Sequence, residues 1–300
     1  MGRADLHVHT SAGDGLDSVT RTFDWVEAEA TLDVLAITEH DDLETALRAR
    51  EEWARTRRPF DFLPGAEVTT LEGHLIALYI EEPVPSFRRV EETIDCVHQQ
   101  GGLCLVPHPL NWLTRSVGSG TLARLAAGPA GAPWFDGIEL ATTSPASRCF
   151  LPRARAENAR VYHLPGVGAS DAHFASAAGT AWTDFPGFSA ADLKRAILEG
   201  TVSAKAAGFP SLRSAGLIRA LALPLTGLRA TPRKMGWRRT LWSFVSRYRL
   251  PGASQPALRA APPVVRAFSP GDGARVRRAF GPAAPPVVPA FSPGDDGYIP

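Results

Sequence analysis

Short apolar runs alternate with amphipathic helical patterns up to about residue 205, and this alternation limits the possible folds more than any other feature. The apolar runs are typical of buried strands and cover residues 33–38, 75–80, 103–106 and 136–140. The helical patterns cover residues 20–30, 42–56, 87–100 and 189–199. Strands that alternate with helices favour a parallel α/β sheet or barrel, and the periodicity alone does not separate the two.

Polar residues with metal-binding side chains follow several of these strands. His40 follows the apolar run that contains Ile37, His108 follows the run that ends at Val106, and Asp171 follows Val167. In α/β barrels the active site is built at the carboxyl ends of the strands. These positions therefore predict a functional site at that end of the sheet.

Histidines paired at strand spacing indicate what kind of site this is. Residues i and i+2 of a strand point to the same face, so His7 and His9 can bind one ion together. Asp171 and His173 repeat the same spacing, and six of the eight histidines have a carboxylate close by in sequence. Nitrogen and oxygen ligands without thiolates suit Zn, Mn or Fe in a hydrolytic site and not a structural cysteine site.

Charge is distributed unevenly along a chain whose formal net charge is only +1. Residues 1–199 contain 17 lysines and arginines against 28 acids, whereas residues 200–271 contain 12 lysines and arginines and no acid. The two parts are therefore expected to make different contacts. The three cysteines are scattered and odd in number, which argues against a disulfide framework.

The sequence predicts neither a secretory leader nor a membrane span. The N-terminus enters a polar strand directly and lacks the apolar core of a signal peptide. The longest apolar stretch, residues 215–228, is interrupted by Arg219 and Pro224 and is too short to cross a bilayer. We therefore expect a cytoplasmic protein.

Composition divides the chain into three predicted segments. Residues 1–205 form the α/β domain, residues 206–250 a basic and helical extension, and residues 251–300 a disordered low-complexity tail. Within the extension, residues 234–250 fit an amphipathic helix whose apolar face is flanked by arginines. The tail contains eleven prolines, six glycines and two copies of one repeat, which is typical of low complexity.

The basic stretch 200–271 has three competing roles. It can pack on the acidic domain, lie on an anionic membrane surface, or hold nucleic acid through phosphate contacts. We expect packing on the domain first, and the sequence does not rank the other two.

The order of the polar motifs resembles that of the PHP family, named for polymerase-associated domains and histidinol phosphatase. The motifs are Asp5-Leu6-His7-Val8-His9-Thr10 followed by Asp14-Gly15, Thr38-Glu39-His40, Gly65-Ala66-Glu67 before Gly73-His74, His108-Pro109, and Ser170-Asp171-Ala172-His173. Each motif alone is weak, but five in this order make a specific combination. The resemblance covers residues 4–205 and implies a distorted (β/α)7 barrel with up to three metals at the strand carboxyl ends.

The resemblance also implies a set of nine metal ligands, and all nine positions carry the expected residue type. A first ion would be held by His7, His9, Glu67 and Asp171. A second ion, bridged to the first by Glu67, would be completed by His74 and His108. A third ion would be held by Asp14, His40 and His173.

Hydrolysis of a phosphate ester explains these residue types. Two cations about 3.5–4 Å apart can share a hydroxide while they clamp the phosphoryl oxygens. A carboxylate such as Glu67 suits a bridge because each of its oxygens can reach one ion. The catalytic hydroxide would lie beside Glu67 and Asp171, so no serine or cysteine nucleophile is required.

Four residues near the motifs are candidates for supporting roles. Arg115 lies in the loop after His108, and both Arg115 and Arg148 are candidates for binding substrate phosphate or are solvated arginines. Glu39 and Asp41 either orient the histidine ligands or are solvated loop acids.

The leading hypothesis is a metal-dependent phosphoesterase that acts on phosphomonoesters or nucleotide-derived phosphates. Stand-alone members of the family are similar to 3',5'-nucleoside bisphosphate phosphatases and to 5'-3' exonucleases of short oligonucleotides, so these substrates come first. A second hypothesis is hydrolysis of a non-phosphate ester or amide. A third is a non-catalytic module that contains metal and binds nucleic acid. The nine ligands around an open cluster argue against this third hypothesis.

Overall fold

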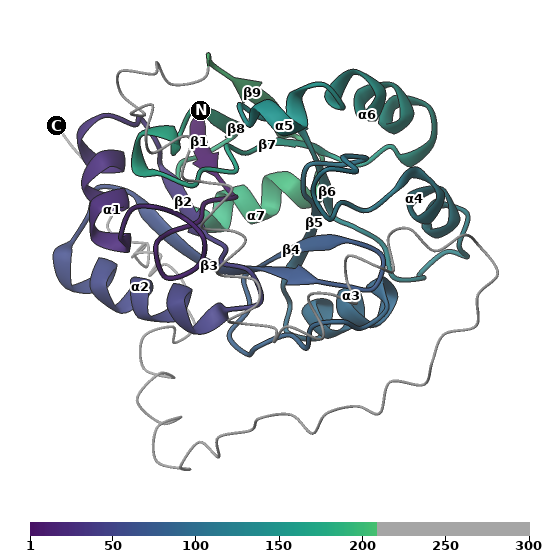
Figure 1. Ribbon diagram of the computed structural model, residues 1–300, viewed down its shortest axis with the longest axis horizontal. Helices are drawn as coiled ribbons and strands as arrows, with labels where there is room; N and C mark the ends of the chain where they lie inside the picture. Colours follow the sequence, from purple (N-terminus) through teal and green to yellow (C-terminus); the bar gives the residue numbers. More distant parts are fainter. Residues whose placement is uncertain (209–300) are drawn as a thin grey trace, which may run out of the picture. The chain divides into compact units, whose positions relative to one another are not determined.

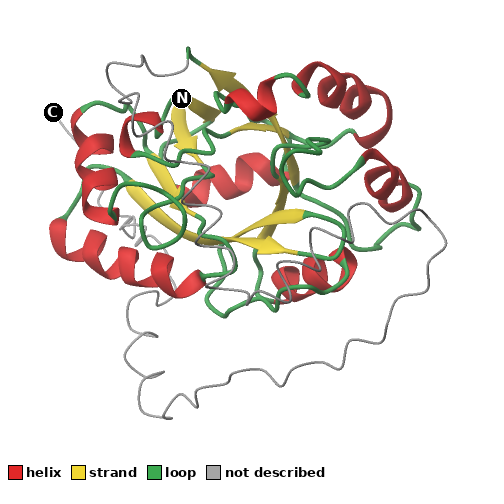
Figure 2. Cartoon of the chain, viewed as in Figure 1, coloured by secondary structure: helices red, strands yellow, loops and turns green. Residues whose placement is uncertain are grey.

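A computed structural model describes residues 1–208 of the chain. One sheet runs through this part and curls into a nearly closed barrel, with most of the helices around its outside (Figure 1 and Figure 2). Its strands are β1 (Gly2–Asp5), β2 (Val34–Ile37), β3 (Asp61–Thr69), β4 (His74–Leu78), β5 (Leu103–Val106), β6 (Gly137–Ala141), β7 (Gly166–Gly168), β8 (Ala181–Phe185) and β9 (Ser203–Ala206). Their order is β7-β6-β5-β4-β3-β2-β1-β8-β9. The expected distorted barrel is confirmed.

The sheet is mixed, whereas the alternation of strands and helices favoured a parallel one. β1, β2 and β3 are parallel neighbours, and so are β5, β6 and β7. β4 runs antiparallel to both β3 and β5, and β8 runs antiparallel to both β1 and β9. Only residues 70–73 connect β3 to β4. This connection is too short for the crossover that a parallel pair needs.

The two ends of the sheet meet at a seam where β7 approaches β8 and β9. The N–H of Gly168 donates to Thr183 Oγ1 at 3.0 Å, and Thr183 Oγ1 donates to the carbonyl of Gly168 at 2.9 Å. A Cβ on Gly168 would overlap the Trp182 carbonyl oxygen and lie 2.8 Å from that of Lys205. Glycine at this position therefore allows the barrel to close.

The helices are α1 (Val19–Ala28), α2 (Leu43–Thr56), α3 (Val90–Gln99), α4 (Ser119–Ala126), α5 (Pro145–Arg148), α6 (Leu151–Glu157) and α7 (Ala190–Leu198), with short turns η1 (Asn158–Tyr162) and η2 (Ala175–Ala177). Four of the helices (α1, α2, α3 and α7) overlap the helical ranges that the sequence predicts, whereas α4, α5 and α6 were not predicted. Side-chain caps fix three of the starts: Ser18 accepts from Arg21 N–H, Asp42 from Thr45 N–H, and Ser189 forms a capping box with Asp192.

Helix α7 fills one end of the barrel, where Figure 1 shows it lying inside the ring of strands. Leu193, Ala196 and Ile197 are buried among the inward-facing side chains of the strands. The N–H of Ala190 donates to Asp61 Oδ2 at 2.8 Å, and Asp61 begins β3. The helix therefore closes the end at which the parallel strands start, and the carboxyl ends of these strands form the opposite end.

Most of the predicted extension 206–250 and all of the predicted tail 251–300 lie outside the described residues. The last described strand, β9, ends at Ala206, and the domain boundary at residue 205 stays a prediction. Within residues 1–208, every helix is too short or too polar to cross a membrane.

Candidate metal centre

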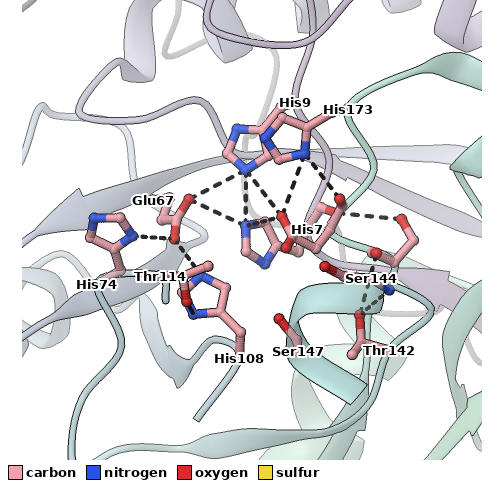
Figure 3. Close-up of polar contacts among 12 residues, drawn as sticks. His7, His9, Glu67, His74, His108, Thr114, Thr142, Ser144, Ser147 and His173 are labelled. Carbon is pink, nitrogen blue, oxygen red and sulfur yellow. Dashed lines mark hydrogen bonds and ion pairs between the residues drawn. The ribbon is translucent and has the colours of Figure 1, made fainter. Parts of the chain in front are cut away.

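Glu67, near the end of β3, contacts histidines through both of its carboxylate oxygens (Figure 3). Oε1 lies 2.7 Å from His74 Nδ1 and 3.0 Å from His108 Nε2. Oε2 lies 3.1–3.3 Å from a nitrogen of each of three other rings, those of His7, His9 and His40. The two oxygens thus serve two separate groups of imidazoles.

Asp171, which lies far from Glu67 in the sequence, belongs to the group around Glu67 Oε2. Its Oδ1 lies 3.6 Å from His7 Nε2 and 3.7 Å from His9 Nε2, and these two nitrogens are 3.0 Å apart. The backbone of Asp171 adopts the left-handed conformation with φ of 54°, which is uncommon for a residue with a side chain. A parallel bridge between Val8 and Ala172 holds the two segments together.

Asp14 forms a third group at the edge of the cluster. Its Oδ2 lies 3.5 Å from both His40 Nε2 and His173 Nε2, and its Oδ1 lies 3.6 Å from His9 Nδ1. The three groups contain all nine residues that the sequence singled out as ligands. The structure therefore brings the whole predicted set together at the carboxyl ends of the strands.

The charges of the cluster depend on one another. Burial alone would raise the pKa of Glu67, but the surrounding imidazoles, His40 first among them, hold that pKa well below its usual range. Burial also opposes protonation of His9 and His173, yet contacts with carboxylates raise the pKa of each ring to about 9. Burial lowers the pKa of His74 to about 4. The buried, ionised carboxylates thus require positive charge, which protons or metal cations can supply.

The arrangement of donor atoms fits divalent metal ions. Four overlapping groups of three residues have ligand atoms within 4.8 Å of one another, and eight of the nine residues belong to them. His74 is connected through its contact with Glu67. Bonds of about 2.1 Å in a tetrahedral site place neighbouring ligand atoms about 3.4 Å apart, close to the 3.0–3.7 Å found here. Imidazole and carboxylate donors without thiolate suit Zn, Mn or Fe.

Glu139 on β6 contacts two of the histidines, although no sequence motif marks it as part of the site. Its Oε1 lies 2.8 Å from His7 Nδ1, and its Oε2 accepts the N–H of His108 at 2.6 Å. The side chain is almost wholly buried. An acid within an otherwise apolar strand run was the one available signal for this role.

The two acids proposed to orient ligands have different surroundings. Glu39 is fully buried, and its Oε1 accepts the N–H of Thr10 at 2.7 Å while its Oε2 lies 3.8 Å from His9 Nδ1. Asp41 instead accepts hydrogen bonds from Thr69 N–H and Ser86 Oγ, both at 2.7 Å. Glu39 therefore lies beside His9, one of the predicted ligands, and Asp41 holds the loop.

Hydroxyl groups contact the second nitrogen of His108. Ser116 Oγ lies 2.7 Å from His108 Nδ1 and donates to the carbonyl of His108 at 2.6 Å, and Thr114 Oγ1 lies 3.1 Å from the same nitrogen. These residues belong to the loop that follows His108, so the loop contacts the imidazole ring of His108 directly. This arrangement directs His108 Nε2 towards Glu67.

The two candidate phosphate-binding arginines lie in different environments. Arg115 Nη2 donates to the carbonyl of Thr70 at 3.2 Å, and the guanidinium stacks 5.4 Å from the centre of the Phe87 ring. Arg148 is exposed at the end of α5 and forms no ion pair among residues 1–208. Between His108 and Arg115, the side chain of Trp112 is 71% exposed.

We expect Glu139→Gln to weaken metal retention and to lower kcat/KM by about 10–100-fold, the usual effect of losing a group that orients a metal-bound histidine. A glutamine can accept from His108 N–H with its single oxygen, but it then presents an NH2 group to His7 Nδ1. Metal content after dialysis and kcat/KM measure the effect, with exposed Glu199→Gln as the matched control. Equal values for both variants would contradict this role.

Comparison with known proteins gives several related results. The family model described as PHP-associated matches residues 153–202. The chain is 33% identical over 128 residues to an uncharacterised protein of Methanocaldococcus jannaschii, covering 39% of this chain and 72% of that protein. It is 36% identical over 88 residues to the 5'-3' exoribonuclease Rnm of Salmonella typhimurium, covering 28% of this chain but only 30% of the exoribonuclease.

Solved structures show the same fold. A two-domain protein from Bacteroides vulgatus that contains a predicted PHP-like metal-dependent phosphoesterase has a TM-score of 0.55 at 19% identity, covering 68% of this chain and 64% of that one. An amidohydrolase from Chromobacterium violaceum has a TM-score of 0.50 at 18% identity, covering 67% of this chain and 97% of that one. Together with the ordered motifs and the barrel, these matches establish that the chain belongs to the PHP family.

Proposed function

We propose that this protein is a metal-dependent phosphoesterase that uses water to hydrolyse phosphomonoesters or nucleotide-derived phosphates. The observation that carries the proposal is the position of Glu67, whose two oxygens contact two separate groups of histidines. A carboxylate placed in this way suits a bridge between two cations. Divalent ions bound there would supply Lewis-acid activation of water and of the phosphoryl oxygens.

The nine clustered residues would divide into three ligand groups, the first two of which share Glu67. The groups would be His7, His9, Glu67 and Asp171 for one ion, Glu67, His74 and His108 for a second, and Asp14, His40 and His173 for a third. Glu139 and Ser116 would keep the rings of His7 and His108 in place. A contact between Arg115 and substrate phosphate would have to compete with its contacts to Thr70 and Phe87.

Two observations support a nucleotide-derived substrate. The chain is similar over 88 residues to an exoribonuclease. The exposed indole of Trp112 belongs to the loop whose ends contact His108, and an exposed aromatic ring offers a base a surface for stacking. We therefore place nucleoside bisphosphates and short 5'-phosphorylated oligonucleotides first among the substrates.

The test is hydrolysis by the full chain with and without metal. After exhaustive chelation we expect turnover of phosphate esters to disappear, and Mn, Zn or Fe should restore it. The substrates are a nucleoside 3',5'-bisphosphate, a 5'-phosphorylated oligonucleotide, a phosphomonoester without a base and a carboxylic ester. Inorganic phosphate should inhibit competitively because it can bridge the same ions as the substrate.

The results separate the competing hypotheses. Full activity in a preparation verified to be free of metal would overturn the proposal. An enzyme that ignores phosphate and cleaves the carboxylic ester would favour the second hypothesis. Metal binding without turnover of any of the four substrates would favour the non-catalytic binding module.

A further inference from the structure

We propose that His98, Cys104 and Asp136 form a second metal site, which takes one transition-metal dication of the Zn type. The proposal is independent of the proposed function, because the three residues belong to different elements from the clustered ligands and contact none of them. His98 is in the last turn of α3, Cys104 is on β5, and Asp136 immediately precedes β6.

The three donors already face one another. His98 Nε2 lies 2.9 Å from Asp136 Oδ2, and the same oxygen accepts the backbone N–H of Cys104 at 2.7 Å. The ligand atoms of the three side chains, including the Cys104 sulfur, all lie within 4.8 Å of one another. The 2.9 Å separation is close to the 3.0 Å between His7 Nε2 and His9 Nε2.

The site lies on the far side of β5 from the barrel interior. Leu103 and Leu105 point inward to the core that contains α7, whereas Cys104 belongs to the core outside the sheet with Ile94 and Val97 of α3. Cys104 and Asp136 occur at the start of their strands, and the metal centre is built at the opposite ends. An ion here would join α3 to two strands of the barrel.

The site is buried except on the side of the His98 ring, which is accessible to solvent. Cys104 is fully buried, the Asp136 side chain is 15% exposed and the His98 side chain is 36% exposed. An ion can therefore arrive past the imidazole, and a water molecule there can complete four-coordination. Burial raises the pKa of the Cys104 thiol, so the dication must displace a proton to bind sulfur.

Nitrogen, sulfur and oxygen donors together select the type of ion. Thiolate and imidazole favour Zn and its neighbours over Mg or Ca, which prefer oxygen ligands. The thiolate also distinguishes this site from the metal centre, where every donor is nitrogen or oxygen. A signal that requires a metal–sulfur bond therefore separates this site from the metal centre.

The experiment is a Co²⁺ titration of the full chain in a Cys149→Ser background, which removes the exposed cysteine. We expect a thiolate-to-cobalt charge-transfer band in the near ultraviolet. Cys104→Ser should abolish the band and remove one Co²⁺ per chain by elemental analysis. Cys96→Ser should keep both, because Cys96 is not among the three ligands.

A second variant tests the site if Cys104→Ser, which changes a buried residue, does not fold. His98→Gln changes a partly exposed ring and should lower the affinity measured from the band by about tenfold or more, while circular dichroism stays unchanged. Hydrolysis should be unaffected by His98→Gln when the metal centre is loaded. A titration without a charge-transfer band would show that His98 and Asp136 form an ion pair only, and a band that persists in Cys104→Ser would show that Cys104 is not a ligand.

Discussion

Glu67→Gln is expected to lower kcat/KM by about three orders of magnitude or more, the largest loss among the single replacements considered. Glutamine has the shape of glutamate but offers one oxygen and one NH2 group. Whichever way the amide turns, one of the two histidine groups loses the oxygen that it now faces. The loss should therefore reach both ions that share this side chain, and no repositioning can restore the bridge.

Elemental analysis and steady-state kinetics on the same samples test this expectation. Metal content should fall by at least one ion per chain, and far-ultraviolet circular dichroism should stay as in the wild type. Exposed Glu82→Gln makes the same chemical change on the surface and should keep full activity and metal content. A Glu67→Gln protein within tenfold of wild-type kcat/KM would show that Glu67 is not a bridging ligand.

Gly168→Ala is expected to cause the largest loss of stability, about 3 kcal/mol or more in the free energy of unfolding. The added Cβ would overlap the carbonyl oxygen of Trp182, and backbone atoms cannot rotate away as the end of a side chain can. Relief requires β7 to separate from β8, which breaks the two hydrogen bonds between Gly168 and Thr183.

Urea unfolding measures this effect, with Gly120→Ala as the matched control. Gly120 lies in α4, and a Cβ there meets nothing within 4 Å, so alanine should leave stability unchanged or raise it slightly. If the two variants unfold at the same urea concentration, the seam does not depend on glycine. Activity measured well below the transition should fall only with the unfolded fraction.

Residues in local motifs were the predictable part of the site. His7 and His9 share a face because strand side chains alternate, and His40 and His108 follow strands whose apolar runs are plain in the sequence. The alternation of strands and helices, which is also read locally, predicted an α/β sheet or barrel, and the resemblance to the PHP family selected the barrel. In each case the information lies within a few residues, so no knowledge of distant contacts is needed.

Residues whose role depends on distant partners were not predictable. Glu139 contacts His7 across 132 positions and His108 across 31, and an acid in an otherwise apolar strand does not indicate which residues it contacts. The contacts of Arg115 with Thr70 and Phe87 are equally remote, so the sequence left it as a candidate phosphate ligand. β4 runs antiparallel because only residues 70–73 connect it to β3. The predicted alternation of strands and helices did not include a connection this short.

The position of β1 as an interior strand, between β2 and β8, has a consequence for how the chain is made. β1 leaves the ribosome first among the strands, yet its second neighbour, β8, begins only at residue 181. Until then one edge of β1 lacks its partner strand, and the ligands at 171 and 173 have not joined His9. Synthesis interrupted before residue 171 leaves an open sheet with an incomplete cluster, a form prone to aggregation through its free edge. The predicted ligand set is thus complete only after residue 173, and the barrel only after β8 and β9 have followed.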